Sequence, residues 1–387
     1  MRIIADRNIP LLPSLFEEQE LVQVEAREIS ADLLSQADAL IVRSVTQVDS
    51  RLLTGSSVRF VATATSGVDH VDLSWLTNSD IAFSSAVGAN ATAVADYVMA
   101  AFSWYLQRAG KRPEQLRCGI VGVGHVGAEV LRRFRALGCV TLACDPPRQE
   151  SGDPLTHDFE DLSALSSCDV VSLHVPLNSS ERHKTAGLID GEFLGALPDG
   201  ALLINTSRGG VLNEMEATHT LTLRKDIHLV LDVFEGEPRA EPDLVSVTHL
   251  ITPHIAGYSR RSKHLAARQV AKALMGFFDL DIPQPSESAD SIDQMRLELA
   301  TGKPDEVWQV ALQCFDLIAI SDSFKRGVRR GDSEGIFDYL RKQCSGRPEY
   351  AEYSAGGQMT AQASDYLAGL GFAMDRESGR SELGKRS

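Results

Sequence analysis

The sequence lacks several features that would mark it as a secreted, membrane or nucleic-acid-binding protein. Its six cysteines form no C-x-x-C pair, and no stretch approaches the roughly 20 apolar residues needed to cross a bilayer. Lys and Arg number 38 against 53 Asp and Glu, which disfavours a broad nucleic-acid surface because phosphate binding needs excess cations. The first residues, MRIIADRNIP, contain no apolar signal-peptide stretch. We therefore expect a cytoplasmic protein with reduced thiols, no membrane or nucleic-acid partner and no metal site.

What the sequence does contain is a repeated alternation of short apolar runs and polar helical stretches. Its 387 residues, 43% of them hydrophobic, suffice for two or three domains with ordinary cores. Over roughly the first 95 residues the alternation predicts a parallel sheet with covering helices. The elements expected there are strands over 2–5, 39–42 and 59–64, followed by a long apolar helix over about 91–107.

The middle of the chain carries a glycine turn between a strand over 118–121 and a helix over about 126–137. The segment GVGHVG contains Gly122, Gly124 and Gly127 in the spacing G-x-G-x-x-G. The first glycine permits a tight turn, the second lets the backbone approach a pyrophosphate, and the third allows the helix to pack closely on the strand. The helix N-terminus adds free N–H groups and a positive dipole end. This context predicts a dinucleotide site.

Asp145 ends the next expected strand, over 140–144, 18 residues after Gly127. A carboxylate at this place accepts hydrogen bonds from ribose hydroxyls and repels a 2′-phosphate, which favours NAD over NADP. The nearby Arg148 weakens that preference, and a plain glycine turn with a solvated Asp is the alternative interpretation. Further strands are expected over 170–174, 201–205, 229–233 and 250–252, and together they predict a doubly wound Rossmann domain.

Three polar side chains each follow one of these strands, where open parallel sheets bind ligands. Arg208, in NTSRGG, can hold a substrate carboxylate with two parallel hydrogen bonds. His254, in PHIAG, can take a hydroxyl proton near neutral pH. Glu237, in DVFEGEP, can bond the far ring nitrogen and stabilise the imidazolium. Each residue alone has an ordinary structural explanation, but together they predict hydride transfer from a 2-hydroxy acid.

The last third of the sequence is less strongly patterned. A helix of mixed polarity is expected over 260–279, and a linker rich in Pro, Ser and Asp over 281–291. An amphipathic helix is expected over 306–321, and residues from 377 onward have the composition of a disordered end.

In the order GVGHVG, NTSRGG, DVFEGEP and PHIAG, the chain resembles the D-isomer-specific 2-hydroxyacid dehydrogenase family over roughly residues 1–280. The resemblance implies that Arg208, Glu237 and His254 are catalytic. It implies a Rossmann domain over 96–257 and a flavodoxin-like split substrate domain over 1–95, completed by 258–280. The implied cofactor contacts are Gly122, Gly124, Val126, Gly127, Asp145, Val175, Thr206, Ser207, Asp232 and Gly257.

Within the family, four segments resemble the members that oxidise 4-phosphoerythronate in vitamin B6 biosynthesis: 42–46, 62–70, 144–148 and 254–258. That resemblance implies that Ser44, Thr65 and Tyr258 contact a small phosphorylated 2-hydroxy acid, with Arg43 as a phosphate or carboxylate partner. Segments 335–342, 347–350 and 370–372 resemble a C-terminal dimerisation domain. They imply a small α+β domain over 281–387 and a homodimer.

The sequence also departs from this pattern. Val175 stands where a hydroxyl residue is common, Ser66 replaces a common Ala, Cys344 replaces an aromatic residue, and the stretch 354–360 fits poorly. Two other activities of the family stay open, a 3-phosphoglycerate dehydrogenase and a glyoxylate/hydroxypyruvate reductase. A non-enzymatic NAD-sensing corepressor is a further alternative, which the presence of His254 as a proton acceptor disfavours.

Overall fold

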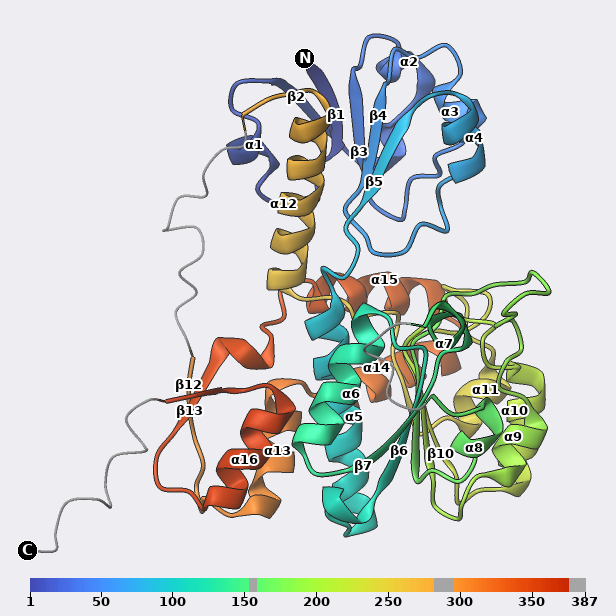
Figure 1. Cartoon of the computed structure of the whole chain (residues 1–387), viewed down its shortest axis with the longest axis vertical. Coiled ribbons are helices and arrows are strands. Elements are labelled where there is room, and N and C mark those ends of the chain that lie inside the picture. Colours follow the sequence, from blue (N-terminus) through green and yellow to red (C-terminus); the bar gives the residue numbers. More distant parts are fainter. Residues whose placement is uncertain (153–158, 282–294, 376–387) are drawn as a thin grey trace, which may run out of the picture. The chain divides into compact units, whose positions relative to one another are not determined.

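The computed structural model describes residues 1–152, 159–281 and 295–375, which form two compact units (Figure 1). Of the described residues, 1–91 and 259–281 belong to the first unit, and 92–152, 159–258 and 295–375 to the second. The chain therefore leaves the first unit near residue 91 and returns to it after residue 258. In the part of the chain that the structure describes, no helix is both long and apolar enough to span a bilayer.

The first unit is built on a five-stranded parallel sheet with the order β2-β1-β3-β4-β5. Alternate residues of each strand enter opposite cores: Ile3 packs with the residues of α12, whereas Ile4 packs with α2, α3 and α4. Because both faces are covered, the central strands are continuous apolar runs. The strands are β1 Arg2–Asp6, β2 Glu20–Val24, β3 Ala39–Val42, β4 Phe60–Thr63 and β5 Ala82–Ser85. The helices are α1 Leu12–Leu15, η1 Ala26–Glu28, α2 Ala31–Leu34, α3 Ser50–Leu53, α4 Leu73–Asn78 and α12 Arg260–Phe277.

The second unit contains a six-stranded parallel sheet with the order β11-β10-β9-β8-β6-β7. Helices α5 and α6 cover one face, and α8 to α11 cover the other (Figure 1). Its strands are β6 Arg117–Val121, β7 Val140–Cys144, β8 Val170–Leu173, β9 Leu202–Asn205, β10 His228–Leu231 and β11 Leu250–Ile251. Its helices are α5 Ala91–Ala109, η2 Pro113–Gln115, α6 His125–Ala136, α7 Pro146–Ser151, α8 Leu162–Leu165, α9 Gly191–Ala196, α10 Glu214–Leu223 and α11 Pro242–Val247. The expected doubly wound α/β class is confirmed, and each expected strand of this sheet lies within two residues of its predicted bounds.

The C-terminal elements pack on this second sheet and share its cores. Helices α13 and α16 join the core of α5 and α6, while α14 and α15 join the core on the opposite face. A small parallel sheet, β12-β13-β14, completes this region. The elements are β12 Met295–Glu298, α13 Pro304–Cys314, α14 Leu317–Arg329, α15 Ser333–Cys344, η4 Tyr350–Glu352, β13 Tyr353–Gly356, α16 Ala361–Leu370 and β14 Ala373–Met374.

A buried charge cluster fastens the C-terminal region to α5 and α6. The Arg133 guanidinium, 1% exposed, donates to Asp96 Oδ1 at 2.6 Å and to the carbonyl of Leu370 at 2.7 Å. The backbone N–H of Tyr350 donates to Asp96 Oδ2 at 2.9 Å. Asp96 is thus held from two regions distant in sequence, and breaking such a buried pair from one side costs about 3–5 kcal/mol.

The prediction of one continuous helix over 306–321 was wrong. The amphipathic stretch 306–321 is not continuous but forms α13 and α14, which are separated at Phe315 and Asp316. The Asp316 carboxylate accepts a hydrogen bond from the N–H of Ala319 and so begins a new helix. The expected disordered end lies outside the described residues, as does all of the expected linker except Asp281. The poorly fitting stretch 354–360 is strand β13 and the loop leading to α16.

Candidate active site

The turn after β6 contains three glycines, and at two of these positions no other residue fits. Gly122 has φ +84°, and a Cβ there would lie 2.7 Å from the carbonyl oxygen of His174. A Cβ on Gly127 would lie 1.9 Å from the carbonyl oxygen of Gly122. A Cβ on Gly124, in contrast, would meet no protein atom within 4 Å. Packing therefore requires the first and third glycines, whereas the second leaves open space at the N-terminus of α6, as a pyrophosphate would need.

The carboxylate of Asp145, at the end of β7, is oriented by two backbone groups. It accepts from the N–H of Val123 at 2.7 Å and from the N–H of Arg148 at 3.1 Å. The Arg148 guanidinium donates to the carbonyl of Val123 and so folds back onto the glycine turn. Asp145 is thus fixed beside the turn, at the position where the ribose of a dinucleotide binds in folds of this type.

His174 was not singled out from the sequence, although it directly follows β8. Its ring lies 2.9 Å from the hydroxyl of Ser172 and 3.3 Å from the hydroxyl of Thr206, and burial lowers its pKa to about 3. The imidazole is therefore neutral at physiological pH and holds Thr206 beside the turn. Val175 also lies beside the glycine turn, since a Cβ on Gly122 would be 2.7 Å from its side chain.

The loop carrying Arg208 is closed by the side chain of Asn205. The amide oxygen accepts from the backbone and hydroxyl of Ser207 at 3.0 and 2.7 Å, and the amide nitrogen donates to the carbonyl of Arg208 at 3.1 Å. A Cβ on Gly209 would lie 2.2 Å from the carbonyl oxygen of Phe234. Only glycine lets this loop lie so close to the neighbouring loop, which carries Glu237.

Glu237 and His254 form a hydrogen-bonded pair. The Nδ1 of His254 lies 2.8 Å from Oε2 of Glu237, while Oε1 of Glu237 accepts from the N–H of Phe234 at 3.2 Å. If Nδ1 carries the proton that bonds Glu237, then Nε2 is left to accept a proton. His254 also has φ +54°, a left-handed conformation that is uncommon outside glycine and clusters at functional sites.

Asp232 fixes the turn that contains His254. Its buried carboxylate accepts from Thr252 Oγ1 at 2.7 Å and from the N–H groups of Ile255 and Ala256 at 2.8 Å each. Burial raises the pKa of Asp232 to about 6, against the opposing influence of a positive charge on His254 and of these hydrogen bonds. An imidazolium at His254 would thus be stabilised by two carboxylates, those of Asp232 and Glu237.

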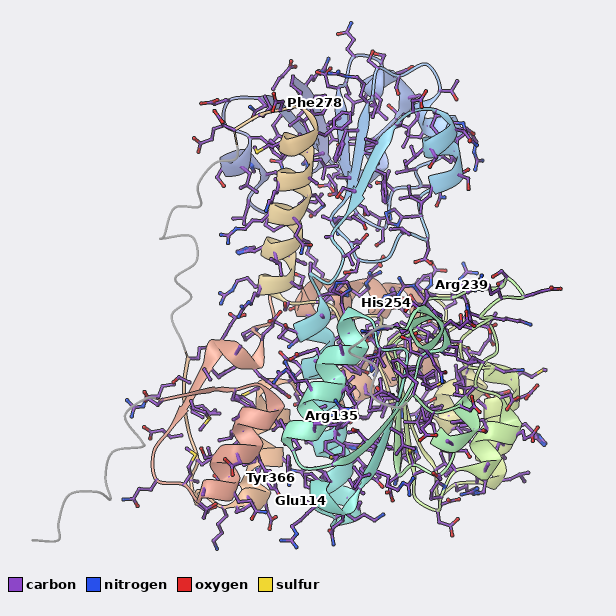
Figure 2. The ribbon with its side chains drawn as sticks, in the orientation of Figure 1. Glu114, Arg135, Arg239, His254, Phe278 and Tyr366 are labelled. Carbon is purple, nitrogen blue, oxygen red and sulfur yellow. The ribbon has the colours of Figure 1, made fainter. Side chains whose placement is uncertain are left out.

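One cavity of about 710 Å³ in the second unit brings Arg208, Glu237 and His254 together. Figure 2 labels His254 and, on the same side of this unit, Arg239, which follows the Glu237 loop. The remaining lining residues are Leu177, Ser179, Ala186, Gly187, Gly209, Gly210, Asn213, Phe234, Glu235 and Gly236. Strands β9, β10 and β11 thus deliver a guanidinium, a carboxylate and an imidazole to one cavity.

Tyr258, four residues after His254, is held by the C-terminal region. Its hydroxyl accepts from Nη2 of Arg341, whose guanidinium also lies over the Tyr258 ring at 5.0 Å. Its carbonyl accepts from Nε of Arg347 at 3.1 Å. No local pattern links these arginines to Tyr258, so they could not be selected as site residues before the fold was known.

The other expected substrate contacts lie in the first unit, after neighbouring strands. Arg43 follows β3 and donates to the fully buried Asp6 at 2.8 Å, and Ser44 beside it is exposed. Thr65 follows β4; its hydroxyl lies 2.7 Å from that of Thr63 and donates to the carbonyl of Gly67 at 2.8 Å. These residues share the carboxyl edge of one sheet.

Known proteins similar to this chain include NAD-binding dehydrogenases. Residues 87–256 match the model of the D-isomer specific 2-hydroxyacid dehydrogenase family, NAD binding domain. The chain is 40% identical to an erythronate-4-phosphate dehydrogenase of Marinobacter nauticus, over 97% of this chain and 100% of the relative. It is 39% identical to the enzyme of the same name from Yersinia enterocolitica, over 96% and 99%.

Solved structures share the fold. An NAD-bound 3-phosphoglycerate dehydrogenase from Entamoeba histolytica superposes with a TM-score of 0.62 at 22% identity, covering 72% of this chain and 95% of that one. A D-lactate dehydrogenase from Aquifex aeolicus, complexed with NAD and lactic acid, gives 0.60 at 21% identity, covering 72% and 96%. The chain belongs to the D-isomer specific 2-hydroxyacid dehydrogenase family of NAD-dependent dehydrogenases and, within it, to the erythronate-4-phosphate dehydrogenases.

Proposed function

We propose that this protein oxidises 4-phospho-D-erythronate to 2-oxo-3-hydroxy-4-phosphobutanoate with NAD, as a step in the biosynthesis of pyridoxal 5′-phosphate (vitamin B6). The name shared by relatives that match nearly the whole chain supports the substrate. The observation that carries the chemistry is the 2.8 Å pair of His254 and Glu237 in the same cavity as Arg208. A proton acceptor, its carboxylate partner and an anion-binding guanidinium are the groups that oxidation of a 2-hydroxy acid requires.

The residues around the glycine turn fit a dinucleotide. Gly122, Gly124, Val126 and Gly127 would hold the pyrophosphate at the N-terminus of α6, and Asp145 would bind the ribose. The remaining contacts would come from Val175, Thr206, Ser207, Asp232 and Gly257. Oδ2 of Asp232 accepts one hydrogen bond and retains capacity for another. When bound, NAD supplies a nicotinamide ring that accepts a hydride.

The three cavity residues then have distinct tasks. Arg208 holds the substrate carboxylate with two parallel hydrogen bonds and so orients C2. Nε2 of His254 takes the proton of the C2 hydroxyl as the hydride leaves C2. Glu237 keeps the imidazole in the tautomer that can accept this proton and stabilises the charge that results.

The remaining assignments complete the proposal. Arg43, Ser44 and Thr65 of the first unit and Tyr258 of the second would contact the rest of the substrate. Functionally, residues 1–95 with 258–280 would form the substrate domain, 96–257 the NAD-binding domain, and 281–387 a dimerisation domain that makes the protein a homodimer. We place the enzyme in the cytoplasm, in keeping with its six free cysteines.

A substrate panel tests this function. The purified full-length chain is assayed for NADH formation with 4-phospho-D-erythronate, D-erythronate, 3-phosphoglycerate and D-glycerate, with hydrazine present to trap the 2-oxo product. We expect the highest kcat/KM with 4-phospho-D-erythronate. Turnover of 3-phosphoglycerate but not of 4-phospho-D-erythronate would refute the substrate. NAD binding without turnover of any 2-hydroxy acid would instead favour a sensor. Native mass measurement of the same preparation tests the dimer.

A further inference from the structure

Helix α15 contacts both segments that flank the paired Glu237 and His254. At its N-terminal end, the hydroxyl of Ser333 donates to the carbonyl of Pro238 and accepts from the N–H of Ala240, both at 3.0 Å. Two turns further along, Arg341 reaches Tyr258. Eight residues of helix separate the two contacts, which places them about 12 Å apart along the helix axis. The helix therefore holds Arg341 at a fixed position relative to the cavity loops.

The guanidinium of Arg341 is held by aromatic rings rather than by a carboxylate. Its central carbon lies 5.0 Å from the ring centre of Tyr258 and 5.2 Å from that of Phe337, one helical turn earlier. Nη2 donates to the Tyr258 hydroxyl, while the buried Nε has no hydrogen-bond acceptor. Among the described residues, no Asp or Glu forms an ion pair with Arg341. Nη1 donates to no described residue and, unlike Nε, is accessible, so it is the donor that an anion can reach.

Three other arginines of the two units already have carboxylate partners. Arg43 is paired with Asp6 at 2.8 Å, Arg239 with Glu334, and Arg347 with Asp96 at 3.6 Å. Arg208 is assigned to the substrate carboxylate and cannot serve a second anionic group at the far end of the same molecule. A net charge of −15 also means that the protein must hold a dianion with a local cation.

We propose that Arg341 binds the phosphate group of the substrate and makes the enzyme specific for phosphorylated 2-hydroxy acids. This rests on the proposed function, because it assigns the phosphate of that substrate to a residue of the C-terminal region. Arg341 offers parallel N–H donors suited to phosphate, and Tyr258 orients them. The solved structures described above, including the 3-phosphoglycerate dehydrogenase, cover only 72% of this chain. Helix α15 belongs to the region outside the matched residues 87–256.

The test compares phosphorylated and unphosphorylated substrates in matched variants of the full-length enzyme. Arg341→Gln should raise the KM for 4-phospho-D-erythronate by about 10-fold to 100-fold, the range expected for a lost charge-assisted contact. The loss of kcat/KM should be at least about 10-fold larger for 4-phospho-D-erythronate than for D-erythronate, and Arg341→Lys should restore part of that difference. Lys342→Gln removes one exposed positive charge from the same helix and should behave as the unaltered protein. Equal losses on both substrates, or no loss on either, would overturn the proposal.

A second measurement is independent of turnover. Inorganic phosphate is titrated into the NAD-bound protein by calorimetry, with NAD affinity and the thermal midpoint as controls for folding. We expect phosphate to bind the unaltered protein and Lys342→Gln equally, and Arg341→Gln at least about 10-fold more weakly. Identical phosphate binding by Arg341→Gln and the unaltered protein would refute the assignment. If 4-phospho-D-erythronate is not oxidised at all, the proposed function fails, whereas the phosphate titration still decides whether Arg341 is an anion site.

Discussion

The two units are built on the same strand order but use it differently. Counted within each unit, both sheets begin 2-1-3-4-5, and the second adds one further strand. In each sheet, successive strands are added on one side of the first strand and then on the other, and open sheets bind ligands at this switch in strand order. In the second unit Gly122 occupies this place and packs against the backbone of His174. In the first unit the corresponding place holds an ion pair of Asp6 and Arg43.

The difference lies in what fixes the loops. In the second unit, glycines bring backbone against backbone, and a buried Asp232 fixes the His254 turn, so the cavity is preformed. In the first unit, hydroxyls and an ion pair fix the loops, through side chains that can change rotamer. The second unit is therefore suited to holding a cofactor and reacting groups in one geometry, and the first to adapting to a substrate.

The largest effect that tests this difference between the two units is expected for His254→Ala. We expect kcat to fall by about 10³-fold, because the proton acceptor is lost while the loops that hold the cofactor are intact. NAD affinity, measured by fluorescence titration, should change by less than about 3-fold. Turnover at the unaltered rate would show that another group takes the proton.

A pair of glycine variants separates packing from ligand approach. Gly127→Ala should lower the free energy of unfolding by about 3 kcal/mol or more, because its Cβ would lie 1.9 Å from a backbone oxygen. Gly124→Ala should leave the unfolding transition unchanged and weaken NAD binding about 10-fold, since its Cβ would meet only the ligand. Chemical denaturation and NAD titration measure the two effects. Equal destabilisation by both substitutions would contradict the assignment of Gly124 to the cofactor.

Acid should weaken the second unit through His174. Its pKa is about 3 when folded and 6.5 when unfolded, so the unfolded chain binds the extra proton below pH 6.5. The contribution of His174 to stability is therefore full above pH 6.5 and falls as the pH is lowered. At pH 5 the loss is at most about 2 kcal/mol, and because His174 is partly exposed we expect a smaller value. Denaturation at pH 7 and pH 5 checks this, with His174→Asn as the variant in which the fall should be smaller. A fall of the same size in His174→Asn would assign it to other groups.

The smallest effect is expected in the first unit. Asp6→Asn keeps one oxygen that can accept from Arg43 Nε but removes the charge and the second oxygen, which accepts from Asn8, and should lower the free energy of unfolding by about 1 kcal/mol. NAD affinity should stay unchanged, because the cofactor contacts belong to the other unit. A loss of NAD binding in this variant would contradict the assignment of cofactor binding to the second unit alone.

The sequence could predict those parts of the molecule where the backbone itself restricts the choice of residue. The turn at Gly122 and Gly127 and the strands that lead to Arg208 and His254 leave clear local patterns, because a tight turn demands glycine and a buried strand demands an apolar run. The hydrogen bond between Glu237 and His254 follows from two such strands being neighbours.

The parts that could not be predicted depend on contacts between distant residues. Arg341 meets Tyr258 across 83 positions of sequence, and nothing in either segment specifies the partner. The break between α13 and α14 depends on whether Asp316 caps a helix or continues one, which amphipathic spacing does not decide. Strands β2 and β5 were not expected, because they are edge strands that are only partly buried and therefore lack a continuous apolar run.

The buried pair of Arg133 and Asp96 has a consequence for any attempt to shorten this chain. Deleting the C-terminal region would remove the Leu370 carbonyl and the Tyr350 amide, and two ionic groups in an apolar interior would lose hydrogen-bonding partners. A form of this chain without that region would therefore need other residues at positions 96 and 133, or water as their hydrogen-bonding partner. In this chain the C-terminal segment is therefore tied to two side chains more than 200 positions upstream, and a substitution at either of them acts on both regions.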